Sequence, residues 1–359
     1  MSLAFEPIRV GQWDLPQRFV MAPLTRNRAG EGMAPTQLNA RYYAQRAGAG
    51  LIISEGTQPS LVGQGYLNSP GIHSAAQIEG WRTVADAVHE RGGRIVVQLM
   101  HAGRIAAADN KQRAETVAPS AIRAPGKMIT AAGPVDHDLP REIATDELPS
   151  VLNEYVQAAR NAIEAGLDGV EVHAANGYLL HQFLSPNSNE RKDEYGGSAQ
   201  GRTRFTVEVI AAVAQAIGAD RVGVRISPGH QFNGVVEDDS ADVASTYGTL
   251  VDQISTLGLA YLSILADPGS DLFADLSQRF GGSVIGNDGF GEVTTLNAVE
   301  STLQGGHAAA VAVGRLYLAN PDLEVRWAEG AGLNEPIMDT FYGGGAEGYT
   351  DYPTLGASA

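Results

Sequence analysis

The chain has 359 residues, of which 43% are hydrophobic and 43 are glycine, a composition typical of globular α/β proteins rather than of disordered or membrane chains. Its 41 acidic residues against 25 basic ones give a net charge of −16, which disfavours nucleic acid as a partner. The absence of cysteine excludes disulfides, thiolate metal sites, iron–sulfur clusters and a cysteine nucleophile. Any redox chemistry must therefore belong to a bound cofactor.

The beginning of the chain lacks a basic segment followed by an apolar run, and nowhere do eighteen or more apolar residues occur together. We therefore expect a cytoplasmic protein that acts on small-molecule substrates without a membrane partner, as a monomer or a homodimer.

Short apolar runs rich in β-forming residues alternate with segments of helical period along the chain. The first three units predict strands at 19–21, 51–53 and 95–97, and helices at 37–47, 75–91 and 147–165. Further strands are predicted at 170–172, 222–225, 261–264, 283–285 and 310–313. Eight βα units without a proline-rich or charged linker fit a single-domain (β/α)8 TIM barrel over residues 1–359 better than two doubly wound domains.

The segment at about 100–146 separates the third strand from its helix and is too long for a plain βα loop. It contains four prolines, which favour an excursion over the barrel mouth, and we expect a β-rich cap there. The sequence also lacks a G-x-G-x-x-G after an early strand and a P-loop motif, so a nicotinamide, if used, would visit rather than reside.

Polar side chains follow the predicted fourth strand, at the end of the barrel where active sites of this fold lie. His173 and Asn176 can both donate hydrogen bonds to one carbonyl or nitro oxygen. Tyr178, two residues further on, can supply a phenolic proton. A lone histidine at a strand end is more often structural, but two donors and an acid together favour a catalytic site.

Other strand ends carry groups that suit a heteroaromatic ring. Thr25 offers a hydroxyl after a proline-fixed turn, Gly56 permits close backbone approach, and the Gln98 amide can both donate and accept. Arg225 closes the fifth strand, where a buried guanidinium needs either a carboxylate partner or an anionic cofactor edge. Each of these residues taken alone also fits an ordinary structural role.

Two glycine turns follow the seventh and eighth predicted strands, at 286–290 and 314–315. This is the usual phosphate position of the barrel, although glycine turns also occur there without a ligand. Near the end of the chain, Phe341 and Tyr342 precede a run of three glycines. The two aromatic side chains can form a lid on a bound ring or a hydrophobic plug on the barrel.

Taken together, these residues make the chain similar to the Old Yellow Enzyme family of FMN-dependent ene-reductases over essentially its whole length. The matching stretches are M-A-P-L-T-R at 21–26, Y-Y-A-Q-R-A at 42–47, S-E-G at 54–56, V-Q-L at 97–99, H-A-A-N-G-Y-L at 173–179, D-E-Y-G-G-S at 193–198 and F-Y-G-G-G-A-E-G-Y-T-D-Y-P at 341–353. Each stretch is weak alone, but their order and spacing are highly specific.

The resemblance implies tightly bound, non-covalent FMN, with the Thr25 hydroxyl at the flavin O4 and Arg225 beside N1 and O2. The implied ring-binding residues are Ala22, Pro23, Leu24, Thr25, Gly56, Gln98 and Arg225, with Tyr342 as a further cofactor contact. The implied phosphate site consists of Asp288, Gly289, Gly314 and Arg315. No metal site is implied.

Threonine at position 25 resembles the subgroup of the original yeast enzymes and of bacterial nitrate-ester and N-ethylmaleimide reductases. That subgroup usually has tryptophan where this chain has Met100, so substrate orientation and stereochemistry cannot be copied from it. Tyr66, Met100 and Phe341 are expected to line the substrate pocket, and residues 267–280 are expected to form another wall.

The implied activity is ping-pong: NADPH or NADH passes hydride to the flavin N5, and the hydride then goes to the β carbon of an activated alkene. His173 and Asn176 would hold the acceptor oxygen, and Tyr178 would protonate the α carbon. Enones, maleimides and nitroalkenes fit this chemistry, as do quinones and nitrate esters. The alternatives are a flavin-storing or flavin-sensing protein without turnover, and a phosphosugar isomerase or aldolase barrel without flavin.

Overall fold

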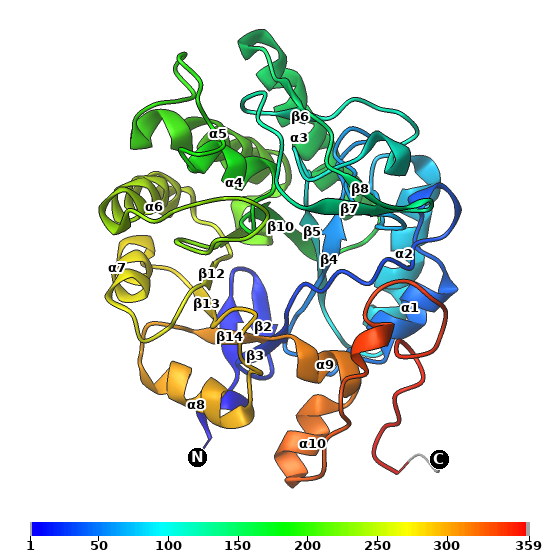
Figure 1. Ribbon diagram of the computed structural model, residues 1–359. Helices are drawn as coiled ribbons and strands as arrows, with labels where there is room; N and C mark the ends of the chain where they lie inside the picture. Colours follow the sequence, from blue (N-terminus) through cyan, green and yellow to red (C-terminus); the bar gives the residue numbers. More distant parts are fainter. Residues whose placement is uncertain (1, 357–359) are drawn as a thin grey trace.

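The protein, for which a computed structural model describes residues 2–356, is a (β/α)8 barrel (Figure 1). Eight parallel strands of the described residues close into a ring, β3-β4-β5-β10-β11-β12-β13-β14, in which β14 pairs with β3. They are β3 (Phe19–Met21), β4 (Ile52–Thr57), β5 (Ile95–Leu99), β10 (Gly169–Ala174), β11 (Val222–Ile226), β12 (Tyr261–Leu265), β13 (Val284–Asn287) and β14 (Ala310–Val313). All eight predicted barrel strands and the fold class are confirmed.

Helices surround the barrel (Figure 1). They are α1 (Gln37–Ala44), α2 (Ala75–His89), α3 (Leu148–Glu164), α4 (Leu179–Leu184), α5 (Ala199–Ile217), α6 (Ser240–Ile254), α7 (Asp271–Phe280), α8 (Leu296–Gln304), α9 (Arg315–Ala319) and α10 (Leu323–Glu329). Short 3-10 turns lie at Leu3–Phe5, Glu31–Met33, Ala108–Asn110, Thr145–Glu147, Ala219–Arg221, Ser255–Leu257 and Met338–Thr340. Capping boxes fix where the first two helices begin, with Thr36 and Asn39 at α1 and Ser74 and Gln77 at α2.

The strands are buried on both faces, which explains why they read as continuous apolar runs rather than as alternating patterns. One set of side chains packs outward against the helices, and a second set packs inside the barrel around Val20, Ile53, Val96 and Ile285. The helices therefore shield the sheet from water, and polar groups can reach solvent only at the ends of the strands.

A hairpin that the sequence analysis did not predict closes the amino-terminal end of the barrel. It consists of β1 (Ile8–Val10) and β2 (Trp13–Leu15), and Trp13 packs into the inner barrel cluster. The amide of Gln12 donates to the carbonyl of Asp220, just before β11. Because each strand has only three residues, neither shows a recognisable period in the sequence. The hairpin leaves the carboxyl end of the barrel as the open face.

The predicted β-rich excursion lies at that carboxyl end. Strand β6 (Val117–Ala118) pairs with β9 (Arg141–Glu142), and β7 (Lys127–Thr130) forms a hairpin with β8 (Gly133–Asp136). Met128 of the hairpin packs in one cluster with Met100 and Tyr178. The cap therefore covers part of the face onto which the fourth barrel strand opens.

The C-terminal segment returns to the barrel beside α1 (Figure 1). The Tyr349 ring stacks on the Tyr42 ring at 4.0 Å between centroids, and Arg26 donates to the carbonyls of Phe341 and Gly348. These bonds tie the aromatic pair at 341–342 to the loop that follows β3. Within residues 2–356, no helix is both long and apolar enough to span a bilayer.

His101, at the base of the cap, should make the fold sensitive to acid. Burial and the nearby charge of Lys111 lower its pKa from 6.5 to about 3, and its Nδ1 accepts a 3.0 Å bond from the Gly103 amide. The folded state therefore keeps this imidazole neutral, while the unfolded chain protonates it below about pH 6.5. The free energy of unfolding consequently decreases as the pH falls below that value.

Between pH 7.5 and pH 5 we expect the free energy of unfolding to fall by about 2 kcal/mol more in the wild type than in His101→Asn, which keeps an acceptor near the Nδ1 position. Urea unfolding of both proteins at the two pH values measures this difference. Equal losses in the two proteins would contradict the assignment.

Candidate active site

The carboxyl ends of neighbouring barrel strands bring most of the predicted site residues together. The register pairs His173 of β10 with Arg225 of β11, and Glu171 of β10 with Gln98 of β5. Since parallel strands end at the same edge, these side chains share one end of the barrel with the loop 22–25 that follows β3. The four side chains from Gln98 to Arg225, which lie up to 127 positions apart in sequence, thus form one polar cluster.

His173 is buried, and one of its ring nitrogens lacks a hydrogen-bond partner among the described residues. Its side chain is 3% exposed, and its Nδ1 has no hydrogen-bond partner among the described residues. Burial, followed by the charges of Arg225 and His181, holds its pKa well below 6.5. At neutral pH the imidazole is therefore neutral, so it can donate one N–H to an acceptor without carrying charge.

Asn176 lies in the turn after β10 with φ 58°, in the left-handed region, and is followed by Gly177 with φ 77°. Its amide oxygen Oδ1 is buried and lacks a partner within residues 2–356. An unbonded buried polar atom is unfavourable unless a ligand or water completes it. His173 and Asn176 thus present unsatisfied polar atoms at the same strand end.

Tyr178 lies beside this pair. Its ring centroid is 5.2 Å from that of His173, and its hydroxyl is 2.8 Å from the hydroxyl of Tyr66. Burial and the neighbouring Tyr66 hydroxyl raise the pKa of Tyr178 well above 10. The phenol therefore keeps its proton across the neutral range and can release it only to a strongly basic acceptor.

Tyr66 and Met100 pack against Tyr178, as expected of neighbouring walls. A Cβ added at Gly56 would lie 2.6 Å from the Met100 sulfur, so glycine at this position makes room for that thioether. The close approach to the Gly56 backbone that we expected is therefore made by the Met100 side chain.

Arg225 does not form the hydrogen-bonded carboxylate pair that was one of the two alternatives raised from the sequence. Within residues 2–356 its guanidinium bonds neutral groups only, the Ser263 hydroxyl at 3.2 Å and the Asn287 Oδ1 at 3.1 Å, while its Nε has no partner. The carboxylate of Glu171 acts on it electrostatically but is itself bonded to the Gln98 amide at 2.7 Å and the Tyr261 hydroxyl at 3.0 Å. The cation is partly neutralised and retains a free donor.

Glu171 and Asn287 are site residues that the sequence analysis missed. Glu171 is a fully buried carboxylate in the middle of the apolar run of β10, and that pattern was the available signal. Asn287 ends β13, directly before the predicted Asp288, and donates to the Ala312 carbonyl at 3.0 Å while accepting from Arg225. It links the predicted ring site to the predicted phosphate loops.

The loop after β3 presents the other predicted ring contacts. Pro23, Leu24 and Thr25 are half-buried, whereas Ala22 is buried. A Cβ added at Gly314 would first meet the Leu24 side chain at 3.5 Å, so these two loops lie next to each other. The Thr25 hydroxyl thus belongs to a partly open rim rather than to the core.

The predicted phosphate residues come from two loops that meet. The Arg315 guanidinium donates to the carbonyl of Phe290, which follows Gly289, and so joins the loop after β13 to the loop after β14. Gly289 has φ 102°, a conformation that favours glycine, and the Asp288 carboxylate accepts a 3.1 Å bond from the Thr294 hydroxyl. Arg315 is half-buried and can still reach an anion at this rim.

The two C-terminal aromatics have different environments. Phe341 is partly buried against Leu318, Ala319 and Tyr352, in agreement with a plug, whereas 67% of Tyr342 is exposed. Tyr342 is nevertheless near enough to raise the pKa of Tyr178 slightly through electrostatics, as the last of several causes. It lies at the rim, on the side of the Tyr66–Tyr178 pair.

The expectation that residues 267–280 form a pocket wall is wrong for most of that segment. Residues 271–280 form α7, whose Phe273, Leu276 and Phe280 are buried in the outer core. An amphipathic helix must bury its apolar face against the barrel, so those side chains cannot also line the mouth. Only the short turn before α7 lies at the carboxyl end of β12.

The polar groups at this barrel end fit FMN. A buried guanidinium with an unpartnered Nε, an amide at Gln98 and a half-buried hydroxyl at Thr25 match the acceptors and donors on the edge of an isoalloxazine ring. The Arg315 side chain at the joined loops is placed for a phosphate. His173 and Asn176 remain available for a second ligand.

Comparisons with known proteins agree with this chemistry. The sequence profile of a family described as "NADH:flavin oxidoreductase / NADH oxidase family" matches residues 3–334. A probable flavin mononucleotide-dependent alkene reductase from Leishmania infantum is 40% identical over 367 residues, which cover 99% of this chain and 98% of that protein.

Solved structures show the same similarity over nearly the whole chain. Morphinone reductase, solved in complex with tetrahydroNAD, is 41% identical with a TM-score of 0.92, over 98% of this chain and 97% of that one. An old yellow enzyme homologue from Zymomonas mobilis is 39% identical with a TM-score of 0.93, over 99% of this chain and 100% of that one.

Proposed function

The chain belongs to the NADH:flavin oxidoreductase / NADH oxidase family and is an FMN-dependent ene-reductase that uses NAD(P)H, and we propose that His173, Asn176 and Tyr178 carry its chemistry. The resemblance to Old Yellow Enzyme is thereby confirmed. The observation that carries the His173 and Tyr178 assignments is the unpartnered Nδ1 of His173 within residues 2–356, beside a phenol that keeps its proton. The unpartnered Asn176 Oδ1 is an acceptor, so the donor proposed for Asn176 is the NH2 group of the same amide.

FMN, when bound, supplies a ring nitrogen that accepts hydride from NAD(P)H and returns it to the substrate. The residues proposed to hold the ring are Ala22, Pro23, Leu24, Thr25, Gly56, Gln98 and Arg225, with Tyr342 at the rim. Those proposed for the phosphate are Asp288, Gly289, Gly314 and Arg315. Arg225 supports this assignment most strongly, because its buried charge retains a free donor.

His173 and Asn176 are proposed to donate hydrogen bonds to the substrate oxygen. Two donors in a buried site withdraw electron density from a conjugated double bond and stabilise the negative charge that develops on that oxygen. A neutral His173 suits this role, because the low pKa lets it act as a donor without protonating the substrate.

Tyr178 is proposed to protonate the carbon next to the activating group. Its raised pKa matches a carbanion-like acceptor, which is far more basic than the substrate itself. Tyr66, Met100 and Phe341 are proposed as pocket walls, supported by the packing of the first two against Tyr178.

The substrate class follows from one oxyanion site next to one acid. Enones, maleimides and nitroalkenes each pair an acceptor oxygen with a reducible double bond, and quinones and nitrate esters offer related acceptors. The net charge of −16 supports small molecules over polyanions. An alkene reductase is also the description of the similar protein from Leishmania infantum.

The visible spectrum of the purified protein tests the proposal directly. Under anaerobic conditions we expect flavin bands that bleach with NADPH and return when cyclohexenone is added. Bands that do not bleach would favour the flavin-storing alternative. A colourless protein that takes up no added FMN would contradict the cofactor assignment.

Replacing the buried arginine tests the ring site separately. We expect Arg225→Met to weaken FMN binding roughly 10- to 150-fold, because one hydrogen bond from a charged donor is lost. Release of fluorescent FMN on dilution measures the affinity, and Arg82→Met on exposed α2 serves as the control. An unchanged affinity would remove Arg225 from the cofactor site.

A further inference from the structure

The turn that carries Asn176 and Tyr178 is held in an unusual way. Asn176 and Gly177 are two consecutive residues with positive φ, at 58° and 77°. A side chain at Gly177 is excluded, because a Cβ there would lie 2.5 Å from the carbonyl oxygen of Phe232. Such a turn persists only where its surroundings fix it, since most residues avoid this conformation.

Side chains satisfy all four backbone polar groups of these two residues. For Asn176, the N–H donates to the Ser227 hydroxyl and the carbonyl accepts from the Asn233 amide, both at 2.9 Å. For Gly177, the N–H donates to His181 Nδ1 at 2.9 Å and the carbonyl accepts from the Gln182 amide at 2.7 Å. Four side chains thus replace the secondary structure that the turn lacks.

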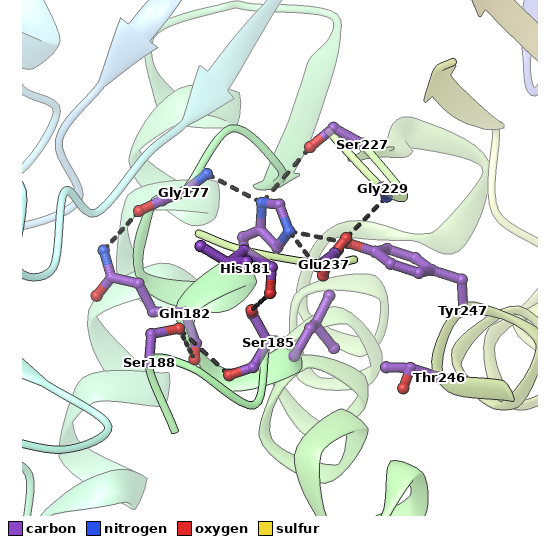
Figure 2. A network of polar contacts seen from close by, with 12 residues as sticks. Gly177, His181, Gln182, Ser185, Ser188, Ser227, Gly229, Glu237, Thr246 and Tyr247 are labelled. Atoms are coloured by element: carbon purple, nitrogen blue, oxygen red, sulfur yellow. Dashed lines mark hydrogen bonds and ion pairs between the residues drawn. The ribbon is translucent and has the colours of Figure 1, made fainter. Parts of the chain in front are cut away.

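His181 connects this turn to a second buried network, which Figure 2 shows. Its Nε2 lies 3.1 Å from Glu237 Oε1 and 2.9 Å from the Tyr247 hydroxyl, which also donates to the Glu237 carboxylate. The His181 and Glu237 side chains are 0% and 3% exposed. The other Glu237 oxygen accepts from the Gly229 amide at 2.8 Å.

The contacts at the two ring nitrogens define a single state of the imidazole. Because the Gly177 N–H donates to Nδ1, that nitrogen carries a lone pair, and the ring proton must sit on Nε2. The N–H at Nε2 then points to Glu237 and Tyr247, whose carboxylate and hydroxyl fix the orientation of the ring. The bond made at one ring nitrogen therefore decides whether the other nitrogen donates or accepts.

We propose that His181, oriented by Glu237 and Tyr247, is a positioning residue that holds the Asn176–Tyr178 turn in its reactive geometry. It acts through the Gly177 N–H and lies buried behind the turn. The proposal rests on the proposed function of Asn176 and Tyr178 as substrate donor and acid. An ordinary capping role at α4 would need the Nδ1 contact but would not require the carboxylate and hydroxyl at Nε2.

Two substitutions distinguish the contact made at Nδ1 of His181 from the contacts made at Nε2. His181→Asn places an amide near the Nδ1 position and keeps an acceptor for Gly177, whereas His181→Gln reaches toward Glu237 and leaves the Gly177 N–H without a partner. The rate of amide hydrogen exchange in a peptide that covers the turn measures how firmly the turn is held, and this measurement does not depend on enzyme activity. We expect faster exchange in His181→Gln than in His181→Asn.

Both half-reactions of the FMN-loaded variants are then followed by stopped flow. We expect His181→Gln to reoxidise with cyclohexenone about 10- to 100-fold more slowly than His181→Asn, because small displacements of reacting groups carry penalties of this order. Flavin reduction by NADPH should differ less between the two variants, since Tyr178 transfers its proton only to the alkene. Tyr247→Phe should fall between them.

Equal exchange and equal reoxidation in the two variants would overturn the proposal. If His181→Gln does not fold, Ser227→Ala removes the acceptor of the Asn176 N–H and should show the same selective loss of reoxidation; an unselective loss there would also overturn it. Failure of the proposed function is recognised separately, because Tyr178→Phe would then reoxidise normally while the exchange difference between the His181 variants remained.

Discussion

Replacing Tyr178 with phenylalanine should slow reoxidation by an enone about 10²- to 10⁴-fold, the range that a positioned general acid contributes. The substitution removes one oxygen and keeps the ring, so packing against Tyr66 and Met100 should survive. Bleaching by NADPH should stay within about threefold of the wild type, because hydride transfer from the nicotinamide needs no proton from this residue.

Anaerobic stopped flow of the two half-reactions measures both expectations on the same preparation. Tyr66→Phe is the matched control: it removes the hydroxyl that lies 2.8 Å from that of Tyr178 but leaves the acid itself. We expect a much smaller loss there. A Tyr178→Phe enzyme that reduces enones at the wild-type rate would assign the proton to another donor, with Tyr66 the nearest phenol.

Replacing His173 with alanine should lower kcat for alkene reduction about 10²- to 10³-fold, as does the loss of one oxyanion donor in other enzymes. The reason is that the neutral imidazole acts where negative charge develops on the substrate oxygen, in a site shielded from water. The low pKa of His173 adds a second expectation, that its donor role does not change between pH 6 and pH 8.

Steady-state kinetics with cyclohexenone and with a nitroalkene check this role. His173→Asn restores a donor of similar reach and should recover part of the lost rate, whereas alanine should not. A His173→Ala enzyme with raised KM but unchanged kcat would indicate that the residue contributes uniform binding only. If the plot of kcat against pH showed an inflection between pH 6 and pH 8 in the wild type but not in His173→Ala, the imidazole of His173 would titrate in that range, which would contradict a neutral side chain.

The barrel itself could be predicted from the sequence because its strands are buried on both faces. Double burial produces short continuous apolar runs, and their alternation with helical periods survives without any knowledge of contacts. The cap was predictable for a related reason, since a proline-rich segment of that length cannot be a plain loop. The hairpin at residues 8–15 could not be predicted, because strands of three residues are too short to show a hydrophobic period in the sequence.

The chemistry at the strand ends was only partly readable. His173, Asn176 and Tyr178 lie within six residues, so their proximity followed from local sequence and the fold class. The partners of Arg225 could not be predicted from the local sequence. Glu171, Ser263 and Asn287 come from three other strands, and their contacts depend on the barrel register. Residues 267–280 were misplaced because helix α7 buries its apolar face in the core.

The sequence by itself determined the eight βα units, the cap and the local cluster at 173–178, since each depends on residue type and near-neighbour spacing. The cofactor class was implied by the family resemblance, which matching stretches spread along the chain carry. Only the tertiary structure decided which charges meet, that Met100 fills the space at Gly56, and that His181 supports the reactive turn with Glu237 and Tyr247. Those contacts join segments up to 66 residues apart, and hydrogen-bond geometry across such distances is set by packing rather than by sequence period.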